Sequence, residues 1–449
     1  MVDQVPASAS DEMIEDPTPV TEDLLKSLET AVEGGETGQI KTLMEPLHVA
    51  DVADVLENLR RDERVAVVTA LGNDLDFDAL SELDESVRDQ LASDLPNATL
   101  AVAVQDMDSD DAVYLLESLD NAERSDVLSK IPESERTQIE RALDYDEDTA
   151  GRLMQTEFIA VPPFWNVGRT IDYMREDDRL PETFSEIYVV DPTFHLLGRI
   201  RLDRLLRTRR PIKVDAIMDP EVRALDVHLD QEEVGRQFER YDLYAAPVTD
   251  ENDRLVGVIT VDDVIEVVQA EADEDVRRLG GVGDESLADT VLRVTQQRFV
   301  WLLINLATAV LASVVIGMFD ATIEQMVALA VLMPIVASMG GNAATQTMTV
   351  AVRALATKDL GSVNARRIIA RETIVGLLNG VMFALILGVA AWLWFGSSGL
   401  GAVIGIAMVV NMLVAGLAGI LVPMALQACK AGHQHVHDHS NADHRTEPA

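Results

Sequence analysis

Four long apolar segments in the last third of the sequence constrain this chain more than any other feature. They cover residues 299–319, 322–352, 368–395 and 400–426. A helix needs about 20 apolar residues to cross a bilayer, and lipid accepts only segments whose backbone groups are bonded within the protein. The sequence therefore predicts an α-helical transmembrane bundle at residues 298–428 with four spans.

The links between these segments predict which side of the membrane each end faces. The link between the second and third segments carries four basic residues against one acid, Asp359, whereas the other two links carry no basic residue. Short basic links remain on the cytosolic side. The first span then starts on the cytosolic side of the membrane. Residues 1–297 are accordingly predicted to be cytosolic, in a multi-pass protein of the cytoplasmic membrane.

The predicted cytosolic part is strongly acidic. Of 77 acidic residues 70 precede Arg298, against 28 of 36 basic residues, so the first 297 residues carry a net charge of about −42. Such a surface disfavours nucleic acid and anionic lipid as ligands and favours cations. An alternative explanation of the acidity is a halophilic source.

Cysteine usage and the N-terminal segment add two expectations. The one cysteine, Cys429, excludes an internal disulfide and is typical of a reducing compartment. Residues 1–21 are polar and acidic, which predicts a disordered segment without a signal peptide.

Three soluble regions are expected before the membrane. Residues 22–143 repeat apolar residues at three- and four-residue spacing, which predicts a helical array. Residues 144–210 and 211–272 form two related units, each a strand, a helix, two strands joined by a turn and a closing helix. A connecting helix follows at 273–297. The predicted fold class is therefore multidomain: an all-α array, an α/β pair and a transmembrane bundle. The helical array contains no nucleophile–base set, phosphate loop or metal-ligand cluster, so no enzyme is predicted.

The second apolar segment contains an unusual polar stretch, "PIVASMGGNAATQTMTV". Pro334 and the pair Gly340-Gly341 weaken the helix, and Asn342 and Thr345 add neutral oxygens that can hold a hydrated cation. Polar groups at this depth either line a watery cavity or bond between closely packed helices. Both interpretations stay open from polarity alone. Asn411 in the fourth segment, beside small residues, favours packing.

An acidic run lies just before the membrane. Glu266, Glu271, Glu274 and Asp275 fall within a few helical turns, where like charges repel. A solvated face is the ordinary explanation. The other is a cation site, because Mg²⁺ binds proteins through one or two carboxylates and retained waters.

The paired units at 144–210 and 211–272 resemble tandem cystathionine-β-synthase-type (CBS) domains, regulatory modules that often bind adenine nucleotides. Gly257, Thr260 and Asp263 match that family's ribose and phosphate motif. The first unit has Arg201 and Arg204 in place of the Thr and Asp. The resemblance implies ATP as a ligand of the pair, with Thr260 and Asp263 in the nucleotide site.

The chain from residue 22 to 428 resembles the MgtE family of magnesium channels. The motifs that carry the resemblance are "DYDEDTAGRLM", "DQEEV", "RYDLYAAPV", "VGVITVDDVIEVVQAEADED" and "MPIVASMGGNAATQ". It implies a homodimeric Mg²⁺ channel that is closed when intracellular Mg²⁺ binds between acidic cytosolic domains and opens when Mg²⁺ falls. Co²⁺ and other divalent cations are further candidate ions, the lipid bilayer is the partner, and no nucleic acid is expected.

Carried over motif by motif, the resemblance assigns two sets of residues. The pore set is Gly341, Asn342 and Thr345, which favours pore lining for the polar stretch. The Mg²⁺-sensing set is acidic and consists of Asp110, Asp230, Glu232, Asp242, Asp263, Glu271, Glu274 and Asp275.

The sequence departs from the family after the fourth segment. A fifth span with a pore aspartate is expected there, and the chain instead reads "CKAGHQHVHDHSNADHRTEPA" at residues 429–449. Three interpretations stay open: a frameshift or truncation, a genuine metal-binding His-rich extension, or a chain that assembles and senses without transport. The alternative function is accordingly a membrane-tethered Mg²⁺ or nucleotide sensor.

Overall fold

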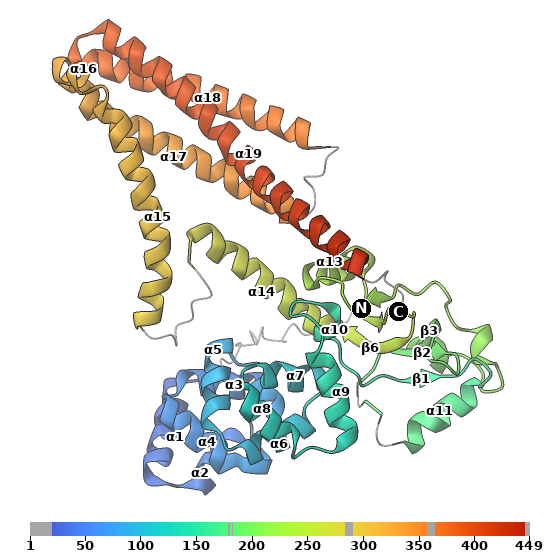
Figure 1. The fold of residues 1–449 in the computed structure, drawn as a ribbon. Coiled ribbons are helices and arrows are strands. Elements are labelled where there is room, and N and C mark those ends of the chain that lie inside the picture. Colours follow the sequence, from blue (N-terminus) through green and yellow to red (C-terminus); the bar gives the residue numbers. More distant parts are fainter. Residues whose placement is uncertain (1–19, 178–179, 182, 283–290, 357–363, 445–449) are drawn as a thin grey trace, which may run out of the picture. The chain divides into compact units, whose positions relative to one another are not determined.

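The computed structural model describes residues 20–177, 180–181, 183–282, 291–356 and 364–444, without the side chains of Leu279 and residues 427–444. The chain divides into two compact units, residues 1–298 and 299–449 (Figure 1), and each is described by itself. The first unit contains the helical array and the CBS pair, and the second contains the membrane helices.

The helical array is a run of short amphipathic helices around one apolar core. Leu28, Leu56, Leu91 and Leu116 are among its fully buried side chains. The helices are α1 (Glu22–Gly34), α2 (Thr37–Met44), α3 (Val49–Asn58), α4 (Arg61–Leu71), α5 (Glu85–Asp94), α6 (Asn97–Asp106), α7 (Ser109–Glu117), α8 (Asn121–Leu128) and α9 (Glu133–Leu143), with short 3₁₀ turns at Gly72–Asp74 and Phe77–Leu80. The array predicted from apolar spacing is thus confirmed.

An arginine joins successive helices at two equivalent positions of the array, where Arg64 is buried and Arg124 is half-buried. The Arg64 guanidinium donates from Nε to the carbonyl of Leu56 at 2.8 Å and from Nη2 to that of Leu59 at 3.1 Å. Arg124 does the same for Leu116, at 3.0 Å. The last carbonyls of a helix lack intrahelical donors, so each arginine satisfies the end of the preceding helix.

We expect Arg64→Met to lower the free energy of unfolding of α3 and α4 by about 2–3 kcal/mol, because it leaves buried carbonyls without charged donors. The matched control is Arg61→Met on the same helix, which breaks only a partly exposed pair with Asp94 and should cost under about 1 kcal/mol. Hydrogen exchange of the α3 and α4 amides in the full chain measures both. Equal losses would contradict the capping role.

Two three-stranded sheets form the CBS pair. In the first, β1 (Ala160–Val161) runs parallel to β2 (Glu186–Val190), which is antiparallel to β3 (Leu196–Arg201). In the second, β4 (Leu225–Asp226), β5 (Ala245–Thr249) and β6 (Leu255–Thr260) repeat this arrangement. The helices are α11 (Val167–Glu176) and α12 (Leu202–Leu206) in the first half, and α13 (Gln231–Tyr241) and α14 (Val261–Gly280) in the second. The predicted order of elements is confirmed in both halves.

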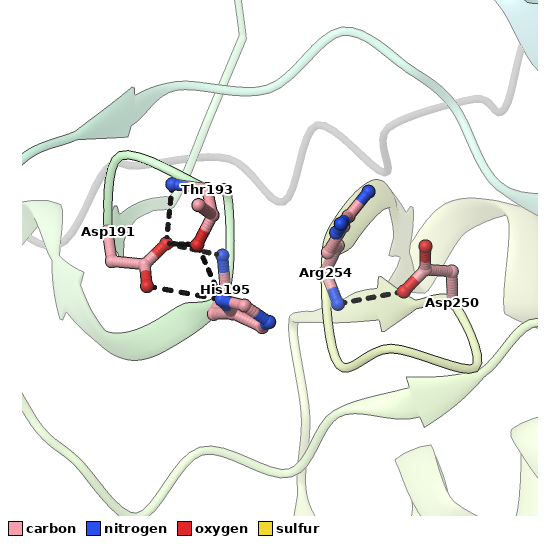
Figure 2. A network of polar contacts seen from close by, with 5 residues as sticks. All are labelled: Asp191, Thr193, His195, Asp250 and Arg254. Carbon is pink, nitrogen blue, oxygen red and sulfur yellow. Dashed lines mark hydrogen bonds and ion pairs between the residues drawn. The ribbon is translucent and has the colours of Figure 1, made fainter.

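The two hairpin turns have the same local chemistry (Figure 2). Asp191 Oδ1 accepts from the backbone N–H of Thr193 at 2.8 Å and of His195 at 2.9 Å. Asp250 Oδ1 accepts from that of Arg254 at 2.9 Å. An aspartate that bonds its own turn fixes the strand register. A backbone bridge between His195 and Arg254 then joins the two turns.

The packing of the CBS pair crosses the limit predicted at residues 210 and 211. Ala150 and Met154, from the short helix α10 (Ala150–Leu153) and the residue after it, are buried in the core of the second half. Val214 and Ile217 are buried in the core of the first half. Each half is therefore completed by residues that precede or follow it, which a sequence repeat does not show.

The predicted connecting helix at 273–297 is divided among three segments. Residues 273–280 are the end of α14, which runs without a break from the last strand of the CBS pair. Residues 283–290 lie outside the described residues, and α15 begins at Val291.

Four helices are long and apolar enough to span a membrane, over Val291–Gly317, Val327–Leu355, Ala365–Phe395 and Ser398–Leu426. They belong to α15 (Val291–Gly317), α17 (Val327–Ala356), α18 (Ala365–Phe395) and α19 (Ser398–His444). This confirms the predicted number of spans. Two predicted starts were wrong: the first helix begins at Val291 and not at Phe299, and the second span starts at Val327, because the polar residues before it form a separate short helix, α16 (Asp320–Gln325).

Glycines let the membrane helices pack closely. A Cβ on Gly376 would lie 2.9 Å from the carbonyl oxygen of Met412, and one on Gly401 would lie 2.5 Å from that of Gly388. On the α17 side, Asn411 Nδ2 donates to the Val336 carbonyl at 2.6 Å. Small residues and interhelical amide bonds are the usual means of association in lipid. The packing role predicted for Asn411 is confirmed.

Candidate cation site

A cleft of about 610 Å³ lies between the helical array and α14. The array contributes α5 and α7, and the CBS pair contributes residues 147–153, the start of α13 and the inner face of α14. Four of the predicted sensing residues line it: Asp110, Asp263, Glu271 and Glu274. Acids that are far apart in the sequence are thus brought to one place.

One stripe of α14 faces this cleft. Asp263, Glu266, Ala270, Glu274 and Arg277 all line it, and their spacing of three or four residues places them on one side of a helix. The acidic run is therefore divided by helix geometry. Glu266, Glu271 and Glu274 line the cleft, whereas Asp275 lies outside its lining.

The carboxyl groups of α7 and α14 repel one another. Burial, with the negative charge of Asp263 second, raises the pKa of Asp111 to about 7 and raises the pKa of Asp110 well above its ordinary value. Burial also raises the pKa of Glu266 to about 7 and that of Asp263 to about 6. The side chains keep some accessible surface because they face the cleft. The full set of charges is unfavourable here unless a cation or protons offset it.

The predicted sensing set left out three contributors to this cluster, of which Glu266 had been named in the acidic run. Asp111 and Glu266 line the cleft, and the charge of Asp108 adds to the repulsion on Asp111. The signals were present: Asp111 follows Asp110 directly, and Glu266 lies one helical turn after Asp263. They were not used because the sensing set was carried over by motif and not by helical face.

Polar contacts attach the start of α7 to the CBS pair near the cleft. Ser109 is buried, and its hydroxyl donates to Glu157 Oε2 at 2.7 Å and accepts from the Thr156 N–H at 2.7 Å. Arg152 Nη1 lies 2.9 Å from Glu117 Oε1, which forms an ion pair at the other end of α7. These contacts oppose the repulsion among the carboxylates.

A second acidic group lies at the start of α13. Burial is the main cause that raises the pKa of Glu232, and the charges of Asp230, Glu271 and Asp275 add to it. Gln231 Nε2 donates to Glu271 Oε1 at 2.8 Å, which joins α13 to α14. The predicted sensing residues that interact here are Asp230, Glu232, Glu271 and Asp275. Glu271 also lines the cleft described above. Asp242 is an exposed residue in the left-handed conformation (φ 49°) after the last turn of α13, and its sensing role stays a prediction.

The donor set suits a hydrated divalent cation. Carboxylate oxygens are the ligands that Mg²⁺ prefers, usually one or two together with waters. Among the residues that the structure describes, no three acidic, histidine or cysteine side chains are set closely enough to hold an ion directly. The site therefore fits an ion that keeps part of its water shell.

Thr260 and Asp263, the predicted nucleotide-binding residues, cap the first turn of α14. Thr260 Oγ1 donates to Asp263 Oδ2 at 2.6 Å, in a capping box at the first turn of α14. Gly257 is explained by packing, since a Cβ there would lie 2.5 Å from Met154 Sδ. A hydroxyl and a carboxylate can hold a ribose, but the acids around Asp263 repel phosphate. Thr260 and Asp263 therefore fit the sugar of a nucleotide and not its phosphates.

The predicted pore residues share the open side of α17. Gly341, Asn342 and Thr345 are exposed, whereas Gly340 and Thr347 are buried on the side that packs against α19. The Thr345 hydroxyl donates to the Gly341 carbonyl at 3.1 Å. A polar helix face is costly in lipid. It requires water or another protein surface as its neighbour.

Two further points concern the membrane part. Arg371 Nε lies 3.8 Å from Glu372 Oε1, which makes a local ion pair near the start of α18. The five histidines of the C-terminal segment have side chains outside the described residues, so the metal-binding interpretation stays a prediction.

Comparison with known proteins decides the family. Three family models match the chain. The model described as "MgtE intracellular N domain" matches residues 47–148, the one described as "CBS domain" matches 214–270, and the one described as "Divalent cation transporter" matches 333–434. The magnesium transporter MgtE of Thermus thermophilus is 32% identical over 426 residues, which cover 90% of this chain and 91% of the relative. The chain belongs to the MgtE family.

Further MgtE proteins agree with this. The magnesium transporter MgtE of Enterococcus faecalis is 34% identical over 289 residues, covering 64% of each chain. A crystal structure of the cytosolic domain of the Mg²⁺ channel MgtE in complex with ATP is 31% identical, with a TM-score of 0.51, over 54% of this chain and 99% of that one. These relatives are named as transporters or channels and not as enzymes. The chain is thus a multi-pass membrane protein with a cytosolic N-terminal part.

The raised pKa values predict a pH-dependent cleft. Carboxyl groups with pKa values of about 6 to 7 bind protons more tightly when the cleft is formed than when it is open. Packing of α7 near α14 without Mg²⁺ should therefore be strongest below about pH 4 and should be lost as the pH rises through about 6 to 7. Hydrogen exchange of α7 amides in Mg²⁺-free buffer measures this. Protection of the α7 amides that increases with pH would contradict the predicted direction of this pH dependence.

Proposed function

We propose that the chain carries Mg²⁺ across the cytoplasmic membrane as a homodimeric channel and that intracellular Mg²⁺ closes it by binding in the acidic cleft. The observation that carries this is the convergence of Asp110 and Asp111 with Asp263 and Glu266, whose charges repel without a cation. We infer that the transported ion is Mg²⁺ because the chain belongs to a family whose relatives are named magnesium transporters. Other divalent cations, Co²⁺ among them, are tested in the same assay.

The gating step follows from the charges. Mg²⁺ binds the formed cleft better than the open one because several carboxylates face it only in the formed state. A ligand shifts an equilibrium toward the state that it binds better. High intracellular Mg²⁺ accordingly holds α7 near α14, and low Mg²⁺ lets the carboxylates separate. Since α14 leads toward the first membrane helix, we propose that it transmits this change.

The pore proposal places the exposed polar face of α17 along the ion path. Gly341, Asn342 and Thr345 offer neutral oxygens and a gap in the side-chain surface, which suit a hydrated cation. The same face requires a neighbour that is not lipid. A second copy of the chain supplies it in the homodimer that we propose.

We propose that ATP binds at the CBS pair, with its ribose near Thr260 and Asp263. The support is the relative whose cytosolic domain was solved with ATP and the ribose-type chemistry of these two side chains. ATP should raise the unfolding temperature of the full chain, and Thr260→Val should remove much of that increase. An equal increase in the variant would place the nucleotide elsewhere.

Neutralising Glu271, Glu274 and Asp275 together should weaken Mg²⁺-dependent closure. Glu271 is bonded to Gln231, and Glu274 forms an ion pair with Arg278, so their repulsion is partly balanced and the main effect is the loss of cation ligands. The Mg²⁺ concentration for compaction, measured by hydrogen exchange, should rise several-fold. A control with the same charge change is Glu33→Gln, Glu36→Gln and Glu45→Gln, three exposed residues of the array. Compaction at the wild-type concentration would contradict the assignment.

The alternative function is a membrane-tethered Mg²⁺ or nucleotide sensor that carries no ions. Both functions predict Mg²⁺-dependent compaction, so that measurement does not separate them. Ion flux separates them. Purified chain in liposomes with a Mg²⁺-sensitive dye inside should give uptake for a channel and a flat trace for a sensor.

A further inference from the structure

A basic segment in the first half of the CBS pair contrasts with the acidity of the cytosolic part. Residues 199–213 contain one acid, Asp203, and seven of the 28 basic residues found before Arg298. The seven are Arg199, Arg201, Arg204, Arg207, Arg209, Arg210 and Lys213. The segment covers β3, α12 and the residues that follow.

Three of these side chains are engaged within the protein. Arg199 pairs with Glu186 at 2.7 Å, Arg201 with Asp203 at 3.1 Å and Arg210 with Asp172 at 2.5 Å. The other four, Arg204, Arg207, Arg209 and Lys213, are exposed. None of the four makes a side-chain hydrogen bond or ion pair with any residue that the structure describes. Their charge is available to a ligand.

Exposed apolar side chains adjoin these four. Leu206 immediately precedes Arg207 and is 64% exposed, Ile212 precedes Lys213 and is 40% exposed, and Phe164 is 66% exposed. The Val167 N–H donates to the Ile212 carbonyl at 2.9 Å, and the Val214 N–H donates to the Trp165 carbonyl at 2.9 Å. These bonds hold residues 212–214 beside residues 165–167, so Phe164 lies close to the basic segment.

We propose that this basic patch, made of Arg204, Arg207, Arg209, Lys213 and the apolar residues Phe164, Leu206 and Ile212, binds anionic phospholipid headgroups of the cytosolic leaflet. Basic side chains that flank exposed apolar ones are typical of segments that lie in a membrane interface. Each basic residue near an anionic leaflet strengthens binding by roughly fivefold. The proposal does not depend on transport.

The acidic remainder of the cytosolic part does not prevent this contact. Charges more than about 8 Å away are largely screened at physiological ionic strength, so the patch acts locally while the acidic surface is repelled. The chain is anchored by its spans, which keeps the bilayer at a high effective concentration. An acidic protein surface would also match the charge, but the spans keep the bilayer, and not a separate protein, within reach of the chain at all times. Anionic lipid matches both the charge and the exposed apolar side chains.

The test uses the full chain in nanodiscs with an environment-sensitive dye on Thr208→Cys, in a Cys429→Ser background. Thr208 lies between Arg207 and Arg209. The dye emission should shift to the blue when phosphatidylglycerol replaces half of the phosphatidylcholine, and high salt should reverse the shift. Arg207→Gln, Arg209→Gln and Lys213→Gln together should remove most of it, whereas the same three sites changed to Lys, Lys and Arg should retain it.

A matched control changes three exposed basic residues of the helical array, Lys26→Gln, Lys130→Gln and Arg141→Gln, with the same loss of charge. It should keep the lipid-dependent shift. No shift with phosphatidylglycerol, or an equal shift in both lipids, would overturn the proposal, and the second result would indicate a protein partner. A shift lost equally in the control would show that net charge and not this patch is responsible.

Discussion

Asp110→Asn with Asp263→Asn is expected to close the cleft without Mg²⁺ at pH 8. Burial, with the charge of Asp263 second, raises the pKa of both Asp110 and Asp111. Repulsion between two carboxylates in a partly buried site costs about 2–4 kcal/mol at the effective dielectric of such sites. Removing them should increase the ratio of closed to open cytosolic domains in Mg²⁺-free buffer by roughly 30-fold or more.

Asparagine is the suitable replacement at both positions. Its amide oxygen can still accept from Thr260, so the cap of α14 is retained while the charge is removed. The control is Asp54→Asn with Asp273→Asn, two exposed acids outside the cleft. Hydrogen exchange of α7, with and without Mg²⁺, measures the closed fraction. If the cleft variant stays open without Mg²⁺ and closes at the wild-type concentration, the cluster is not the sensor.

Two adjacent glycines in α17 should respond in opposite ways to alanine. A Cβ on Gly340 would lie 2.2 Å from Asn411 Nδ2, whereas one on Gly341 meets nothing within 4 Å. Asn411 cannot move aside without losing its bond to the Val336 carbonyl. Overpacking of this kind costs about 1–3 kcal/mol. Gly340→Ala should therefore lower the unfolding temperature in detergent by several degrees, and Gly341→Ala should leave it unchanged or raise it.

A double-mutant cycle isolates the cause. If the clash with Asn411 is responsible, Gly340→Ala should cost little in an Asn411→Ala background, so the two changes are not additive. Transport gives the second readout: Gly341→Ala should reduce Mg²⁺ uptake while the protein stays folded, because the added methyl group lies on the proposed ion path. Equal losses of stability at both glycines would contradict the division of α17 into a packing side and an open side.

The sequence predicted elements well where one periodicity dominates. Apolar spacing identified the helical array, the strand and helix order of both CBS halves, and the four spans. It did not show that Ala150 and Met154 complete the second CBS half, because they lie within the residues predicted to form the first half. Nor did it show that the second span begins at Val327, because Ile323 and Met326 make the polar segment that forms α16 resemble the start of the span.

The candidate site was predicted in part for a similar reason. Asp110 and Asp263 came from motifs, and their meeting across the cleft depends on tertiary packing that no local pattern contains. Asp111 and Glu266 were left out of the sensing set, although Asp111 follows Asp110 directly and Glu266, named in the acidic run, lies one helical turn after Asp263. The hydrogen bonds of Ser109 with Thr156 and Glu157 could not be predicted, because a serine, a threonine and a glutamate at these positions carry no distinctive sequence signal.

Mg²⁺ uptake into liposomes that contain this 449-residue chain, at low and at high internal Mg²⁺, tests the central claim most directly. The account predicts uptake when internal Mg²⁺ is low and strong inhibition when it is high, with inhibition persisting at low Mg²⁺ in the Asp110→Asn and Asp263→Asn variant. A folded wild-type protein that gives no uptake at either concentration would contradict transport and favour the sensor. Uptake of equal rate at both concentrations would contradict gating by the cleft.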